Sequence, residues 1–221
     1  MLTILSRLSA AVLAACALAS SPLTTLAAPH ALHTSNASPR ALYQQAFQSL
    51  RHVGRFQFLE TAQVLESPSK TVQDAFRYTA PDRIITAVEV KPDHGQVLAV
   101  KSVQVGTTKC QTPPGWVCYH FARPDVVAEV RALLEPKLRS PSYRVVGGGK
   151  SLLTIEITGK SQRFSYVGSL TLGARDHLPR TIDGSIHQDQ RLVVSQRVSF
   201  TYGGHYRIEL PKGKGVHLPK P

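Results

Sequence analysis

Short runs in which apolar and polar residues alternate fill most of this chain after residue 54. Such alternation places the apolar side chains of a β-strand on one face. Turn-forming residues separate the runs, for example the Pro-Asp-His-Gly sequence at 92–95. About ten strands with short connections predict one large antiparallel sheet that runs from hairpin to hairpin. The predicted strands lie at 56–64, 72–79, 83–90, 97–105, 116–121, 143–146, 152–157, 164–172, 180–187, 192–201 and 206–210.

Two segments have helical spacing instead. Ser38 can cap a helix that begins at Pro39, and its apolar residues recur at helical spacing until Gly54. The segment 124–138 carries a second apolar stripe. Because both stripes need cover, we expect a mainly β (α+β) fold, in which two amphipathic helices close a curved antiparallel sheet or incomplete β-barrel. The second stripe consists of Val126, Val127, Val130, Leu133, Leu134 and Leu138.

The first 28 residues have the pattern of a secretory signal peptide. One positive charge at Arg7 precedes a short apolar run, and small residues continue to Ala28. Two processing routes fit: cleavage near Ala27 or Ala28, or cleavage before Cys16 followed by acylation of that cysteine, because residues 13–16 resemble a lipobox. We therefore expect a signal peptide at 1–28, a flexible leader at 29–38, one β domain at 39–211 and a disordered basic tail at 212–221.

The chain is basic, with 26 Lys and Arg against 14 Asp and Glu and a formal net charge of +12. Such a charge attracts a protein to anionic membrane surfaces. The positive residues are scattered, and no basic helix or stripe interleaved with aromatic residues concentrates them. We therefore expect an anionic membrane as a partner and no nucleic acid.

Cys110 and Cys118 flank a Pro-Pro-Gly turn between two extended runs. In an exported protein this arrangement predicts a disulfide. The alternative is a redox or metal pair, which needs a closer spacing or more ligands than the sequence supplies.

Motifs for catalysis are missing from the sequence. The glycines at 147–149 precede Lys150 and Ser151, but a phosphate-binding loop needs a further glycine where Arg144 stands. The sequence has no G-x-S-x-G motif, its nine histidines are dispersed, and its acidic residues are few. We expect neither an enzyme nor a cofactor or metal site.

Three local motifs carry a family resemblance: the sequence FRYTAPDR at 76–83, the sequence VGTTK at 105–109 with Trp116, and Leu178-Pro179-Arg180 with the closing runs 198–202 and 208–211. In this order they resemble the LolA/LolB-like superfamily, which includes LppX- and LprG-type lipoproteins and the N-terminal domain of RseB-like periplasmic regulators. The resemblance covers nearly all of the chain after the signal peptide. It implies a periplasmic protein whose incomplete barrel holds an apolar cavity for acyl chains.

These expectations favour a periplasmic or envelope-associated carrier of lipids or lipoprotein anchors, with 124–138 as a lid. One alternative is an RseB-like sensor or regulatory module that uses the same cavity and an envelope protein partner. Another is a structural envelope protein without a ligand, because the same residues can form a sealed core. The candidates for the cavity or lid are Phe56, Phe58, Trp116, Val127, Val130, Leu133 and Leu134.

Overall fold

The computed structural model describes residues 37–112, 115–161, 163–212 and 216. The predicted signal peptide, most of the leader and most of the basic tail lie outside these residues. All helices and strands below belong to the unit Ser38–Pro221.

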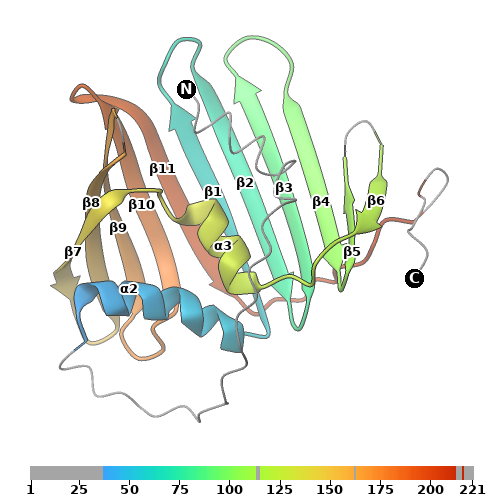
Figure 1. Cartoon of the computed structure of the whole chain (residues 1–221), viewed down its shortest axis with the longest axis horizontal. Coiled ribbons are helices and arrows are strands. Elements are labelled where there is room, and N and C mark those ends of the chain that lie inside the picture. The colour runs from blue at the N-terminus through green and yellow to red at the C-terminus, as the bar shows by residue number, and fades with distance from the viewer. Residues whose placement is uncertain (1–36, 113–114, 162, 213–215, 217–221) are drawn as a thin grey trace. The chain divides into compact units, whose positions relative to one another are not determined.

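The unit is built on one 11-stranded sheet in the order β6-β5-β4-β3-β2-β1-β11-β10-β9-β8-β7 (Figure 1). Every pair of neighbouring strands is antiparallel, and the sheet is curved but not closed, with β6 and β7 at its two ends. This confirms the predicted fold class. The strands are β1 (Arg55–Val64), β2 (Lys70–Thr79), β3 (Arg83–Pro92), β4 (Leu98–Val105), β5 (Thr108–Gln111), β6 (Val117–His120), β7 (Arg139–Gly148), β8 (Leu152–Ser161), β9 (Phe164–Gly173), β10 (Pro179–Gln188) and β11 (Arg191–Tyr202).

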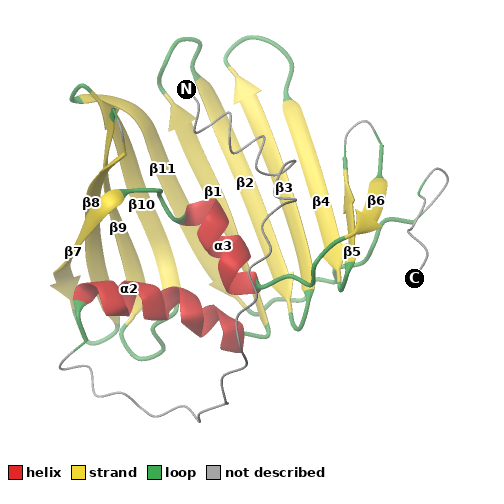
Figure 2. Cartoon of the chain, viewed as in Figure 1, coloured by secondary structure: helices red, strands yellow, loops and turns green. Residues whose placement is uncertain are grey.

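Two helical segments lie over one side of the sheet (Figure 2). Helix α2 (Pro39–Gln48) continues into a 3₁₀ turn, η1 (Ser49–His52), and Ser38 Oγ accepts a hydrogen bond from the backbone N–H of Ala41, as its capping role predicts. Helix α3 spans Val126–Leu134. The predicted extension to 138 is wrong, because Pro136 disfavours helical geometry at Glu135, whose ψ is 119°.

We call the face toward the helices the inner face and the opposite one the outer face. Phe58 of β1 is buried on the inner face, where it is the partner of Phe76 in β2 and of Phe200 in β11. Paired residues of an antiparallel sheet share a face. The register therefore extends the assignment from Phe58 to the residues of the other strands, each of which lies on one of the two faces. The alternation read from the sequence therefore matches the observed sides of the sheet.

Two predicted details at the strand level differ from the structure. Strand β5 was absent from the predicted runs; it is a four-residue strand that pairs with both β4 and β6. The predicted strand at 206–210 is wrong: Gly203 and Gly204 have φ angles of 77° and 98°, which turn the chain out of β11. The segment instead crosses strand ends, and Tyr206 Oη contacts the backbone oxygens of Phe56 and Tyr78 at 2.7 Å.

The main core lies between the helices and the inner face. Its buried residues come from both helices, from β1 to β3 and from β8 to β11. Two glycines make room in it, because a Cβ atom at Gly168 or Gly184 would lie 2.4 or 2.6 Å from the hydroxyl of Tyr166. Tyr166 therefore lies across two neighbouring strands where no side chain competes with it.

Candidate functional site

Most of the predicted cavity residues meet in the main core. Phe56, Phe58, Val127, Val130 and Leu134 are buried members of it, and Leu133 is partly buried against it. The ring of Phe58 stacks on that of Phe76, with centroids 5.0 Å apart and planes 4° apart. The structure thus brings these residues together. That they line a ligand cavity stays a prediction.

Trp116 does not join this cluster. It lies directly before β6, in the hairpin at one end of the sheet, and is half-buried. Its distance along the sheet from β1 separates it from the other candidates, since four strands lie between β1 and β6. Trp116 is therefore not part of the cluster that the other predicted cavity residues form.

Beyond the helices, the inner face continues as an aliphatic surface, of which Leu98 is exposed and Ala62, Val64, Val90 and Val194 are buried. In Figure 1 both helices lie over the half of the sheet that is formed by β1, β11, β10, β9, β8 and β7. No described helix lies over β3 to β6. The register places eight aliphatic side chains on the inner face away from the start of β1. They are Ala62 and Val64 of β1, Val72 of β2, Val88 and Val90 of β3, Leu98 and Val100 of β4, and Val194 of β11.

Two carboxylates lie within this surface. Glu60 and Asp74 are partners across β1 and β2, and their residues are 3% and 8% exposed. Glu60 accepts a hydrogen bond of 2.8 Å from Gln196 of β11. Buried acidic residues are uncommon on an apolar face. Sequence reasoning missed this pair. The available signal was the spacing of two by which Glu60 follows Phe56 and Phe58, because this spacing puts its side chain on the same face of a strand.

The outer face carries two shallow grooves, of about 710 and 280 Å³. The larger one crosses β7 to β11 and β1. Its lining includes five serine or threonine side chains and the pair Asp183 and Arg197, which are joined by an ion pair of 2.6 Å. The smaller one crosses β1 to β4, and Leu59 lines both. Neither groove is lined by any of the predicted cavity residues.

Burial changes the acidity of two tyrosines at the core. It raises the pKa of Tyr43 and of Tyr202 well above the usual value of 10.0, in Tyr43 with a further contribution from the charge of Glu135. Both hydroxyls therefore stay protonated at neutral pH, and that of Tyr202 donates to the backbone oxygen of Pro179. These groups stabilise the fold as neutral side chains and are not poised for proton transfer.

Within the described part of the chain, no three His, Cys, Asp or Glu side chains are grouped so that they could hold a metal ion. No helix there is long and apolar enough to cross a membrane.

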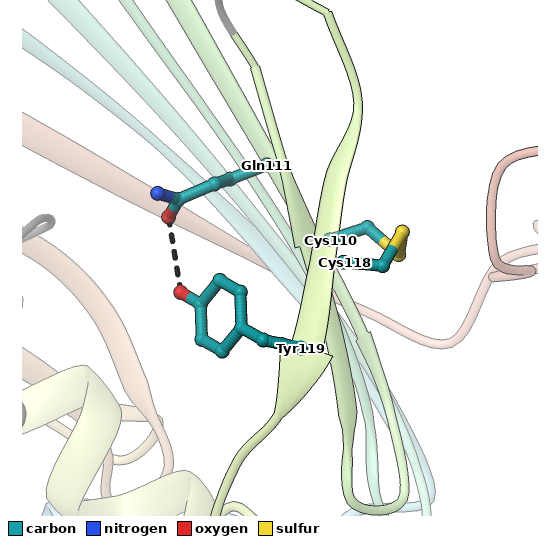
Figure 3. The surroundings of a disulfide bond; sticks show 4 residues. All are labelled: Cys110, Gln111, Cys118 and Tyr119. Carbon is teal, nitrogen blue, oxygen red and sulfur yellow. Dashed lines mark hydrogen bonds between the residues drawn. A yellow bond between two sulfur atoms is a disulfide. The ribbon is translucent and has the colours of Figure 1, made fainter. Parts of the chain in front are cut away.

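The predicted disulfide between Cys110 and Cys118 is present and links β5 to β6 (Figure 3). On the other side of the hairpin, Tyr119 Oη donates a hydrogen bond of 3.1 Å to Gln111 Oε1. The hairpin is thus held by a covalent bond on the outer face and by a hydrogen bond on the inner face.

No protein-family model matches the chain, and no curated protein sequence matches it either. Among solved structures, the chain is similar to the complex of Pseudomonas aeruginosa MucA and MucB, with a TM-score of 0.39 and 16% identity. The aligned part covers 75% of this chain and 56% of that chain, so this chain spans just over half the length of its structural neighbour. A likeness at this level assigns no ligand, activity or partner to the chain.

Proposed function

We propose that this chain is an exported binding protein of the cell envelope that takes up acyl chains of lipids or lipoprotein anchors on its inner face. The observation that carries the proposal is the aliphatic surface of β1 to β4, which continues the inner face beyond the two helices. An acyl chain gains roughly 0.8 kcal/mol for each methylene buried on such a surface. The proposal includes no catalytic activity.

Two further observations support this reading. Leu98 lies on the aliphatic surface and is 58% exposed, which leaves apolar area for an acyl chain to cover. The Cys110–Cys118 disulfide fits an oxidising compartment such as the periplasm.

An anionic membrane is the second partner that we propose. Exposed aliphatic side chains occur at one end of the sheet, at Leu65 after β1, at Val97 and Leu98 beside the turn before β4, and at Leu192 in β11. Arg191 and Arg163 lie in or beside turns at that end, since β10 and β11 meet there and so do β8 and β9. Apolar side chains beside cations suit the interface of an anionic bilayer. Sedimentation with vesicles of phosphatidylglycerol and phosphatidylcholine tests this, and binding that is independent of phosphatidylglycerol content would contradict it.

The inner-face proposal is tested with two aspartates on neighbouring residues. Val88 lies on the inner face and Ala87 on the outer face, and both are half-buried in β3. A fluorescent fatty acid is titrated into the wild type, Val88→Asp and Ala87→Asp. We expect Val88→Asp to weaken uptake at least about tenfold, because a charge on the surface must be desolvated, and Ala87→Asp to leave uptake unchanged.

The other predicted functions have distinct outcomes in the same experiments. If the wild type takes up no fatty acid, and native mass spectrometry of protein purified from its own cells shows only the apo mass, the protein is a ligand-free structural module. Equal effects of the two aspartates would place binding away from the inner face. Uptake of lipid that changes the affinity for an envelope protein would identify a sensor instead of a carrier.

A further inference from the structure

The two edges of the sheet are built differently. Strand β7 contains Pro141, and its pairing with β8 shifts register twice, between Arg139 and Ser142 and between Val145 and Gly147. Prolines and bulges of this kind prevent a further strand from pairing with an edge. Strand β6 has neither: it pairs with β5 in unbroken register and contains no proline. Its four residues suit a short partner strand.

The disulfide shows where the backbone groups of β6 point. The Cα atoms of Cys110 and Cys118 are 4.0 Å apart, the short separation of a non-hydrogen-bonded antiparallel pair. In such a pair the N–H and C=O groups point away from the partner strand. The backbone groups of Cys118 therefore point to the edge of β6 with which no described strand pairs, which we call the free edge, and those of Val117 and Tyr119 point to β5. The cross-link keeps this edge extended before any partner arrives, which lowers the entropy lost on binding.

The side chains at this edge are of the kinds that dominate protein interfaces. Trp116 is half-buried directly before β6, and Val117 is 55% exposed. Tyr119 is fixed by its hydrogen bond to Gln111 (Figure 3). Tryptophan and tyrosine are enriched among residues that contribute most to binding.

Charge indicates which partner the edge would accept. Residues 94–124 contain no Asp or Glu, but they contain Lys101, Lys109 and Arg123. Arg123 forms an ion pair with Asp82 at 3.6 Å. Lys109 lies over the ring of Phe121, a contact that does not neutralise its positive charge. A second copy of the chain would bring the same positive charges to the interface, so an acidic partner is favoured.

We propose that the free edge of β6 binds an extended acidic segment of a partner polypeptide, which adds to the sheet as a further strand. The backbone groups of Cys118 pair with the segment, Val117 on the inner face contacts its apolar residues, and Lys101 on the outer face attracts the carboxylates of the alternate residues. The backbone edge of β6 is not part of the aliphatic surface of β1 to β4, so the inference does not depend on lipid uptake.

The probe is a blocked synthetic peptide of about nine residues in which valine alternates with glutamate. Two control peptides carry lysine in place of glutamate, or proline at the central valine. Trp116 is the only tryptophan of the chain, so its emission reports binding at this edge. We expect a saturable blue shift with the glutamate peptide alone, because the lysine peptide is repelled and the proline peptide loses a backbone donor.

Matched variants locate the site on the full chain. Val117→Ser is paired with Val145→Ser, an exposed valine of the other edge strand, and Lys101→Glu is paired with Lys150→Glu, which makes the same change in net charge at the β7–β8 turn. We expect Val117→Ser and Lys101→Glu each to weaken peptide binding about tenfold. The two controls should bind like the wild type. Circular dichroism verifies that all four variants are folded.

Four outcomes would overturn the proposal. Equal binding of the lysine and glutamate peptides would show that the edge does not select an acidic segment, and no binding of either would show that it does not accept a further strand. A wild-type dimer that Val117→Ser dissociates identifies a second copy as the occupant. A shift of Trp116 emission with anionic vesicles, but with no peptide, identifies a lipid surface.

Discussion

Two regions of the inner face differ in both composition and cover. Near the start of β1 the face lies under the helices and consists of aromatic rings, among them Phe56, Phe58 and Phe76, whose centroids are 5.0–5.8 Å apart. Toward β4 it consists of valines and Leu98, and no described helix lies over it. Interlocked rings tolerate little change in volume, whereas an aliphatic surface can be covered by chains of various shapes. Stability and the proposed uptake therefore depend on different parts of one face.

The largest effect is expected from Phe58→Ala. Phe58 is 2% exposed and stacks on Phe76, so its removal leaves a cavity in the core. We expect the free energy of unfolding to fall by about 3–5 kcal/mol, measured by chemical denaturation. Val100→Ala, in the region over which no described helix lies, should cost much less and serves as the control. A loss below about 1 kcal/mol at Phe58 would mean that the region under the helices is loosely filled, as a ligand cavity would be.

Loss of the disulfide should have the next largest effect. Replacing Cys110 and Cys118 by serine frees a hairpin that the bond closes over a sequence separation of 8. We expect a loss of about 2–3 kcal/mol, because the cross-link restricts the unfolded chain. Thermal unfolding of the variant and of the reduced wild type should agree. If neither of them unfolds at a lower temperature than the oxidised protein, the β5–β6 hairpin keeps its place in the sheet without the bond.

A smaller effect is expected at the N-terminus of α3. Asp125 accepts hydrogen bonds from the N–H groups of Val127 and Ala128 at 3.0 and 3.3 Å and forms an ion pair of 2.8 Å with Arg51. Asp125→Ala should cost about 1 kcal/mol in denaturation experiments. Asp125→Asn keeps a capping oxygen and loses only an exposed ion pair, so it should cost less. Equal losses would show that the ion pair, and not the cap, holds the helix over the core.

The smallest effect is a dependence on alkaline pH. The pKa of Tyr43 is raised in the folded protein, mainly by burial, above its ordinary value of 10.0. The folded state then binds more protons than the unfolded state above that value, so the stabilisation is complete below pH 10.0 and is lost as the pH rises further. Denaturation at a series of pH values should show a decline above pH 10.0 that is shallower in Tyr43→Phe. An unchanged slope in this variant would assign the decline to other tyrosines.

Local patterns predicted much of the fold. The alternation of β1, the cap at Ser38 and the disulfide between Cys110 and Cys118 depend on neighbouring residues, and the structure confirms all three. The run at 206–210 has the same alternation but pairs with no described strand, because two glycines before it turn the chain. Alternation alone does not reveal such a turn.

The candidate site was predicted in part. Apolar spacing identified the core residues of β1 and α3, since burial follows from hydrophobicity. Trp116 was grouped with them by its apolar character, but the order of the strands separates it from β1. Pairing of Glu60 with Asp74 depends on the register between β1 and β2, which the sequence pattern did not supply.

By itself, the sequence determined the class of the fold and the residues with a buried side, because periodicity and turn chemistry are local properties. Which strands form the edges, how much of the inner face the helices cover, and where the disulfide directs the backbone of β6 were decided only by the tertiary structure. These features arise from contacts between residues far apart in the chain, such as Phe58 with Phe200. No local pattern encodes such contacts.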